Sequence, residues 1–160
     1  MKLYLFIVIS YLIGSIPTGF LLARATGGGD IRKAGSGNIG ATNVTRLLGK
    51  KLGPFTLLGD VLKAVIPMLA VYWYFVHSGI PVSAQDLDLA VSLCGGAAFL
   101  GHLYPVYLKF KGGKGVATAL GVFIVLEPVA VLISLFLFIG VVYFSGFVSV
   151  GSLLVSALMT

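Results

Sequence analysis

Charged side chains are scarce in this chain. Lys, Arg, Asp and Glu make up 10% of its 160 residues, whereas soluble domains carry about 25%. Hydrophobic residues account for 58%, and the mean hydropathy is +1.07. So few charges cannot cover a soluble globular surface, and the composition therefore predicts an integral membrane protein in a lipid bilayer.

Acidic residues are the scarcest of the charges. Five Asp and Glu stand against eleven Lys and Arg, which leaves a net charge of +6. This excess indicates anionic partners, either lipid head groups or anionic substrates. It does not indicate nucleic acid, because few positions remain outside the apolar runs, and no obligate protein partner is evident.

Cysteine occurs once, as Cys94 within a hydrophobic segment. Neither an intrachain disulfide nor a cysteine-based metal site can form from it, and the sequence predicts no metal site. We interpret Cys94 as a small buried side chain.

The sequence contains several long apolar runs. The run over residues 3–23 would cover about 31 Å as a helix, which matches a bilayer core of about 30 Å. It is too long for a signal-peptide core and its basic cluster follows it, so we expect a retained span. Further spans are predicted over residues 54–76 and 89–108.

The apolar stretch of residues 115–144 is interrupted only by Glu127 and Pro128. Proline disfavours helical geometry at the residue before it, so we predict a hairpin there between two helices of about 12 and 17 residues rather than one long helix. The pattern of residues 147–160 indicates the start of another span. The predicted fold is an all-α, multi-pass transmembrane bundle of about five spans plus that start, forming a single domain over residues 1–160 that lacks its C-terminal part.

Basic residues are concentrated in two loops. Six lie between the first two predicted spans and three follow the third, and Lys and Arg are retained on the cytoplasmic side of a membrane. The loop between the second and third spans carries Asp86 and Asp88 and no Lys or Arg. We therefore expect an external N-terminus and cytoplasmic basic loops.

The first basic loop contains "GSGNIG", in which Gly35, Gly37 and Gly40 form the G-x-G-x-x-G pattern of dinucleotide-binding folds. That fingerprint requires a preceding strand within a βαβ unit. Here a predicted membrane span precedes the loop, and Asp60, at the place of the ribose-binding acid, falls inside the next span. The context therefore excludes a dinucleotide site.

The same loop favours a different anion site. Glycines let backbone N–H groups point into one concavity, more effectively beside a helix N-terminus. Side-chain donors are added by Ser36, Asn38, Thr42 and Asn43. Arg46 contributes a planar fork suited to phosphate. We predict an anion cradle, with an ordinary glycine-rich linker as the alternative.

The second basic loop, "LKFKGGKG", places Lys114 among Gly112, Gly113 and Gly115 at the start of a helix. This arrangement favours phosphate binding, with a role in membrane orientation alone as the alternative. A P-loop is excluded, because Leu108 and Gly115 stand where Gly and Ser or Thr are required.

Three ionisable residues fall within or at the ends of spans. His102 is either a general base or a helix-end hydrogen-bonding group. Asp60 and Lys63 share one helix face and are costly to bury, so we expect them to pair and to hold the bundle or line the site. His77 lies on the external side and is assigned no role.

Four segments together resemble one family: "GSGNIGATNVTR", "LGDVLKAVIP", "GHLYPVYLKFKGGKGVATALG" and "FVSVGS". They are similar to the bacterial acyl-phosphate:glycerol-3-phosphate acyltransferases, integral-membrane enzymes of phospholipid synthesis. The resemblance implies transfer of a fatty acyl group from acyl phosphate to the 1-hydroxyl of glycerol 3-phosphate, giving lysophosphatidate and phosphate, without a cofactor. It also implies the bacterial inner membrane, with the active site facing the cytoplasm.

The resemblance assigns roles to particular residues. It implies that Ser36, Arg46, Lys114 and Ser152 contact phosphate groups and that the glycines shape the loops. We take Ser36 and Lys114, with His102 as the candidate base, as the catalytic residues. The implied substrate-binding residues come from both loops and from the chain's last segment: Gly37, Asn38, Gly40, Thr42, Asn43, Arg46, Gly112, Gly113, Gly115 and Ser152.

Two other functions were weighed. A transporter or channel for organic phosphates would also use cationic loops and an ion pair at depth, but the short acidic external loop offers no second recognition site. Other glycerol-phosphate acyltransferases use H-x-x-x-x-D, and that motif is absent because Val82 and Tyr107 stand five positions after His77 and His102.

Overall fold

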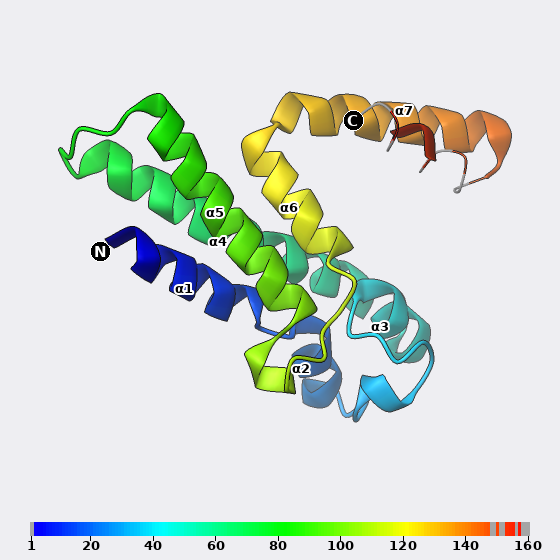
Figure 1. Ribbon diagram of the computed structural model, residues 1–160. Coiled ribbons are helices and arrows are strands. Elements are labelled where there is room, and N and C mark those ends of the chain that lie inside the picture. The colour runs from blue at the N-terminus through cyan, green and yellow to red at the C-terminus, as the bar shows by residue number, and fades with distance from the viewer. Residues whose placement is uncertain (1, 148–149, 151–152, 156, 158–160) are drawn as a thin grey trace. The chain divides into compact units, whose positions relative to one another are not determined.

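The structure is a computed structural model that describes residues 2–147, 150, 153–155 and 157 (Figure 1). Every regular element in these described ranges is helical, as predicted. The chain divides into two compact units, Met1–Val125 and Leu126–Thr160. Each unit is described by itself.

Unit 1 begins with a bent pair of helices where the sequence predicted one continuous span. α1 (Lys2–Gly14) and α2 (Thr18–Ala25) are bent by 42° across a short break. Pro17 has no N–H to donate and disfavours helical geometry at Ile16, which accounts for the position of the break. The pair still has the length and composition of one broken span.

The long helices of unit 1 are α4 (Leu52–His77) and α5 (Ala84–Leu103). α4 matches the predicted span, whereas α5 begins earlier than the predicted residue 89. Ser83 caps α5, because its Oγ accepts a hydrogen bond from the Asp86 N–H at 3.1 Å. Asp86 and Asp88 therefore lie in the helix and not in the loop where the sequence placed them.

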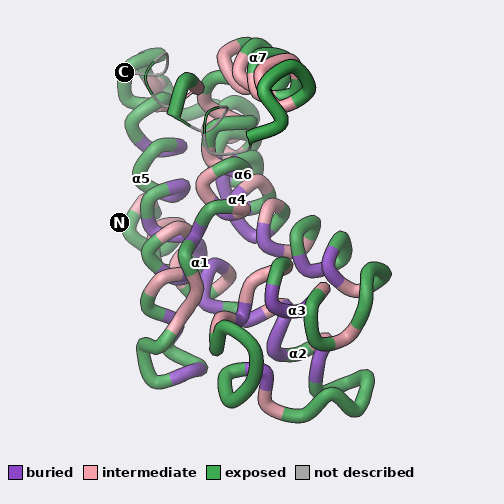
Figure 2. The backbone as a smooth tube through the Cα atoms, turned by 90° about the vertical axis from the view of Figure 1, so that its right-hand side faces the viewer, coloured by how far each residue is buried: buried purple, intermediate pink, exposed green. Residues whose placement is uncertain are grey.

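Glycines allow the close approach of α1 to α5. A Cβ added to Gly14 would collide with the backbone of Ala98, and one added to Gly101 would collide with the backbone of Tyr11 and Ser15. Small residues at helix crossings are how membrane helices pack closely. Buried residues line the inward faces of these helices, and exposed apolar side chains cover their outer faces (Figure 2). Cys94 is fully buried, as predicted.

Two shorter helices follow, and they confirm the predicted break at Glu127. α6 (Val116–Leu126) has 11 residues and α7 (Pro128–Ser145) has 18. The hairpin between them stays a prediction. Among the residues described, three helices are long and apolar enough to cross a membrane, or four if the bent pair forms one span. The predicted total of about five spans therefore also stays a prediction.

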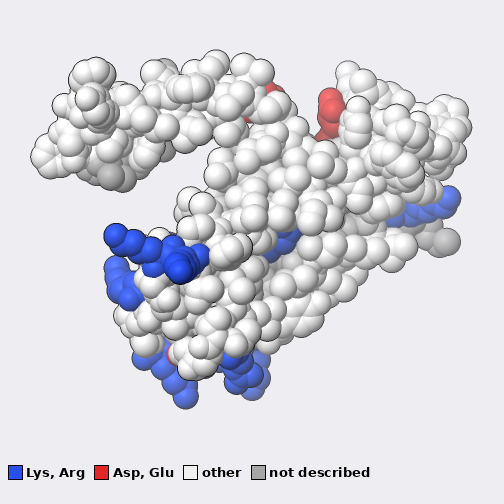
Figure 3. Space-filling view, turned by 180° about the vertical axis from the view of Figure 1, so that it is seen from behind, with Lys and Arg blue, Asp and Glu red and all other residues white. Residues whose placement is uncertain are grey.

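One end of unit 1 is built from short elements: α2, η1 (Ile31–Lys33), α3 (Ala41–Leu48) and η2 (Val106–Leu108). They enclose a small apolar core made of Phe20, Ala23, Ile31, Ile39, Val44 and Leu108. Figure 3 shows Lys and Arg side chains gathered at this end of the unit. The two predicted anion-binding loops meet here.

Candidate functional site

A pocket of about 360 Å³ lies where the two loops meet. Residues from both loops line it, although they are far apart in the sequence. The predicted site residues that line the pocket are Ser36, Asn38, Gly40, Thr42, Asn43, Arg46, His102, Lys114 and Gly115. Asp60, which the sequence predicted either to hold the bundle or to line the site, also lines the pocket. The other lining residues were not predicted from the sequence: Ala41, Leu57, Val116, Ala117 and Leu120.

Three predicted glycines do not line this pocket: Gly37, Gly112 and Gly113. Gly37 has a φ of +70°, a left-handed conformation that favours glycine, so it shapes the loop. The N–H of Gly113 donates to the His102 carbonyl at 3.1 Å, and a Cβ on Gly113 would collide with His102 Nε2. The absence of a side chain at Gly113 therefore leaves room for the imidazole ring of His102. Ser152 lies outside the described residues.

The buried side chain of Asn43 organises the first loop. Its Oδ1 accepts the N–H of Ser36 at 2.9 Å. Its Nδ2 lies 2.8 Å from the carbonyl oxygen of Asn38 and 3.1 Å from that of Ile31. Both amide hydrogens are committed within the loop, so the structure gives Asn43 a positioning role. Its predicted contact with substrate stays a prediction.

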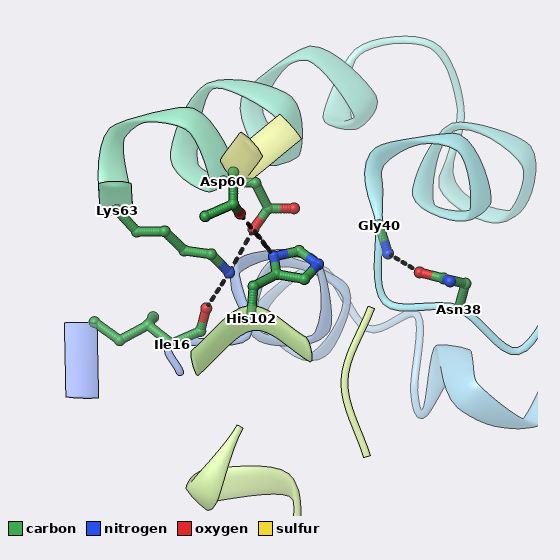
Figure 4. Close-up of polar contacts among 7 residues, drawn as sticks. Ile16, Asn38, Gly40, Asp60, Lys63 and His102 are labelled. Atoms are coloured by element: carbon green, nitrogen blue, oxygen red, sulfur yellow. Dashed lines mark hydrogen bonds and ion pairs between the residues drawn. The ribbon is translucent and has the colours of Figure 1, made fainter. Parts of the chain in front are cut away.

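Three of the loop's own N–H groups are bonded within the loop and so are not free for the backbone nest that the glycine pattern predicted. Besides Ser36, Gly37 donates to the Ala34 carbonyl at 3.1 Å and Gly40 donates to Asn38 Oδ1 at 2.9 Å (Figure 4). The asparagine side chains satisfy donors that would otherwise face a ligand. What remains is the first turn of α3, which starts after Gly40 without a side-chain cap and so keeps N–H groups available for an anion.

Two exposed cations, Arg46 and Lys114, line the pocket. Neither forms an ion pair within the part of the chain that the structure describes. Arg32, in contrast, is already bound, since its Nη2 lies 2.7 Å from Asp30 Oδ2. This guanidinium hydrogen bond lowers the pKa of Asp30 to about 2, so the carboxylate stays charged at any neutral pH. Arg46 and Lys114 are therefore the cations of this pocket that remain available for an anion.

A buried ion pair lies at the inner end of the pocket. Asp60 is 2% exposed and Lys63 is 5% exposed. Lys63 Nζ lies 3.0 Å from Asp60 Oδ1 and donates to the Ile16 carbonyl at 3.1 Å (Figure 4). That carbonyl lies at the break between α1 and α2, where it also accepts the N–H of Thr18 at 3.1 Å. The predicted pairing is confirmed: Lys63 ties α4 to the break, and Asp60 lines the site.

His102, 3% exposed, stands beside this pair. Its Nδ1 lies 2.9 Å from Thr118 Oγ1 and 3.8 Å from Asp60 Oδ1. A nearby carboxylate favours the tautomer with the proton on Nδ1, which leaves the lone pair on Nε2. Figure 4 shows Nε2 turned toward the side where Asn38 and Gly40 lie. The two predicted alternatives, a hydrogen-bonding group and a base, are therefore compatible, one on each ring nitrogen.

Gly113→Ala tests whether the space for the histidine ring matters. The added methyl must displace His102, and a misplacement of about 1 Å can cost on the order of 100-fold in rate. We expect a loss of turnover of roughly 10- to 100-fold in a steady-state assay, with the folded yield retained. Gly96→Ala is the matched control, because a Cβ there meets no atom within 4 Å. Equal activity of both variants would contradict a positioning role.

Comparison with known proteins gives a consistent result. A family model described as Glycerol-3-phosphate acyltransferase matches residues 4–160. The glycerol-3-phosphate acyltransferase of Syntrophotalea carbinolica is 52% identical over 155 residues, which cover 96% of this chain and 74% of the relative. That of Desulfotalea psychrophila is 53% identical over 98% of this chain and 76% of the relative.

A solved structure is also similar. The crystal structure of PlsY, an integral membrane glycerol 3-phosphate acyltransferase in its glycerol 3-phosphate form, is 40% identical with a TM-score of 0.78. The match covers 98% of this chain and 74% of that one. The lysophosphatidic acid form of the same protein gives a TM-score of 0.77 at 39% identity.

The all-helical fold, with apolar outer faces and a cationic pocket at one end of unit 1, defines a helical integral membrane protein. The chain belongs to the glycerol-3-phosphate acyltransferase family. It is therefore an acyltransferase of phospholipid synthesis, and the transporter interpretation is set aside.

Proposed function

We propose that the protein transfers a fatty acyl group from acyl phosphate to the 1-hydroxyl of glycerol 3-phosphate. The products are 1-acyl-glycerol 3-phosphate and inorganic phosphate. The observation that carries this proposal is the single pocket that gathers Ser36, Arg46 and Lys114 from two separate loops. Glycerol 3-phosphate and lysophosphatidic acid, with which PlsY was solved, are the acceptor and the product of the same transfer.

The reaction needs little covalent help from the protein. An acyl phosphate is an activated mixed anhydride, so catalysis consists mainly of holding two anions and stabilising the charge that develops. The hydroxyl oxygen bonds to the acyl carbon, the bond from that carbon to the phosphate oxygen breaks, and the electron pair leaves with phosphate. No acyl-enzyme forms.

The pocket's side chains fit these tasks. Arg46 and Lys114 hold the phosphate groups, and Ser36 donates its hydroxyl, which has no other partner among the described residues. His102 Nε2 takes the proton from the 1-hydroxyl as the new bond forms. The predicted contact of Ser152 with phosphate remains part of the proposal.

The acyl chain leaves the pocket on its apolar side. Leu57 of α4 and Val116 and Leu120 of α6 line that side, and all three side chains are exposed, with Val116 at 74%. Exposed apolar side chains next to a polar site suit a lipid tail that extends into the bilayer. We place the tail between α4 and α6.

We further propose that the basic end of unit 1 faces the cytoplasm of a bacterial cell, with the N-terminus outside. The separation of the basic loops from Asp86 and Asp88 along α5 supports this orientation in the inner membrane. Both units would then belong to one acyltransferase domain, as the family match over residues 4–160 suggests. The turn at Glu127 would return the chain across the membrane.

The donor is tested with purified protein in lipid nanodiscs. Palmitoyl phosphate and labelled glycerol 3-phosphate should yield labelled lysophosphatidate and an equal amount of phosphate, whereas palmitoyl-CoA should yield none. Ser36→Ala, which removes one hydroxyl donor and leaves the loop's backbone bonds in place, should reduce the rate on the order of 100-fold. Product from palmitoyl-CoA alone would overturn the donor assignment.

A further inference from the structure

Asp60 is the one carboxylate among the described residues that line the pocket. Its position is unusual for an anion site, because a carboxylate repels the phosphates that Arg46 and Lys114 attract. Burying a charged carboxylate costs free energy, so the charge must be compensated by an ion pair within the bundle or must interact with a ligand. The ion pair with Lys63 accounts for only one of its two oxygens.

The two carboxylate oxygens have different surroundings. Oδ1 is 3.0 Å from Lys63 Nζ and 3.8 Å from His102 Nδ1. The contacts of the carboxylate within the described part of the chain all involve Oδ1. Since no buried side-chain oxygen there lacks a partner, Oδ2 is accessible to solvent, and Figure 4 shows it turned away from Lys63, toward the side of Asn38 and Gly40. Lys63 thus fixes the carboxylate through one oxygen and leaves the other directed into the pocket.

We propose that Asp60 Oδ2 accepts a hydrogen bond from the 2-hydroxyl of glycerol 3-phosphate and selects an acceptor substrate that carries this hydroxyl. The proposal rests on the function proposed above. His102 Nε2 serves the 1-hydroxyl, and Asp60, its neighbour at the inner end of the pocket, serves the hydroxyl on the adjacent carbon. The cations at the exposed rim bind the phosphate, so the polarity of the pocket matches that of a polyol phosphate.

This arrangement has a consequence for specificity. A carboxylate accepts hydrogen bonds and donates none, so a hydroxyl at carbon 2 is bound while a ketone oxygen at the same place is repelled. Dihydroxyacetone phosphate, which has that ketone, should be a poor acceptor. An asparagine at position 60 can donate through its amide and should tolerate the ketone.

The test measures kcat/KM for glycerol 3-phosphate and for dihydroxyacetone phosphate with palmitoyl phosphate as donor. In the wild-type protein we expect a strong preference for glycerol 3-phosphate. In Asp60→Asn the preference should fall on the order of 10- to 100-fold, because the favoured pairing is lost and the disfavoured one is relieved. Asp88→Asn, an exposed carboxylate on α5, is the control and should keep the wild-type preference.

A second variant keeps the test valid if Asp60→Asn alone does not fold. Asp60→Asn leaves Lys63 buried without its partner, so the double variant Asp60→Asn/Lys63→Met, which removes both charges, is measured as well. It should show the same reduced preference, since Lys63 does not line the pocket. As a third acceptor, propane-1,3-diol phosphate has neither the 2-hydroxyl nor the ketone, so the change in its kcat/KM measures the effect of each substitution that is common to all acceptors, including any effect through His102.

The outcomes separate the two proposals. Wild-type protein that makes no lysophosphatidate would remove the proposed function itself. Wild-type activity with an unchanged preference in both folded variants would remove only the role of Asp60, and would assign the carboxylate to packing alone.

Discussion

Lys114→Ala is expected to lower acyl transfer by about two to three orders of magnitude, with normal membrane insertion and folding. Lys114 is exposed, lines the pocket and forms no ion pair with the residues that the structure describes. Removing one preorganised group that stabilises charge in a transition state costs on the order of 100- to 1000-fold. The measurement is kcat and kcat/KM with palmitoyl phosphate and glycerol 3-phosphate.

Lys111→Ala is the matched control for this effect. Lys111 lies in the same loop, is equally exposed and does not line the pocket. It should retain near wild-type activity, because its charge is screened by solvent and salt. A similar loss in both variants would mean that the loop's total charge matters and not the position of Lys114.

Arg46→Ala should resemble Lys114→Ala, and Arg46→Lys should recover only part of the activity. A guanidinium binds phosphate through two parallel N–H groups, which an ammonium cannot reproduce. Full recovery by lysine would indicate that Arg46 contributes charge alone. The comparison therefore distinguishes a bidentate contact from simple attraction.

Lys63→Met is expected to have the largest effect on stability. It leaves Asp60 buried without its ion-pair partner and removes one of the two donors to the Ile16 carbonyl, which keeps the Thr18 N–H. Breaking a buried pair from one side costs about 3–5 kcal/mol. The loss should appear as a lower midpoint of thermal unfolding in detergent.

The double variant Asp60→Asn/Lys63→Met separates charge from packing. Because it removes both buried charges, it should recover most of the lost stability, leaving a deficit of about 0.5–1.5 kcal/mol for the lost Lys63 hydrogen bond, since the Ile16 carbonyl keeps the Thr18 N–H. Lys50→Met, at an exposed position, should have no effect. An unchanged midpoint in Lys63→Met would show that the pair contributes nothing to the bundle.

The glycine-rich loop shows which features of the site the local sequence could predict and which it could not. The residues Ser36, Arg46 and Lys114 were found because phosphate chemistry requires donors and cations next to glycines, and the structure brings these residues to one pocket. Asparagine side chains take two of the N–H groups expected in the nest, those of Ser36 and Gly40. Asn43 does so across seven residues, and nothing in the local pattern distinguishes that from a free donor.

The contacts inside the bundle were harder to predict from the sequence, because they join residues that are distant along the chain. Periodicity predicted that Asp60 and Lys63 would pair, since residues three apart share a helix face. It could not predict that Lys63 would also bind the Ile16 carbonyl, because that contact joins residues 47 apart in the sequence. The role of Gly113 beside His102 is of the same kind.

The sequence by itself determined that this protein is an α-helical membrane protein, where its helices break at Glu127, and which loops carry the polar residues that line the pocket. These features follow from hydrophobicity, proline geometry and charge, which act locally. Only the tertiary structure decided which loop groups remain free for a ligand and which carboxylate reaches the pocket. Those outcomes depend on competition among partners that only the packed bundle brings together, as Asn43, Gly113 and Asp60 each show.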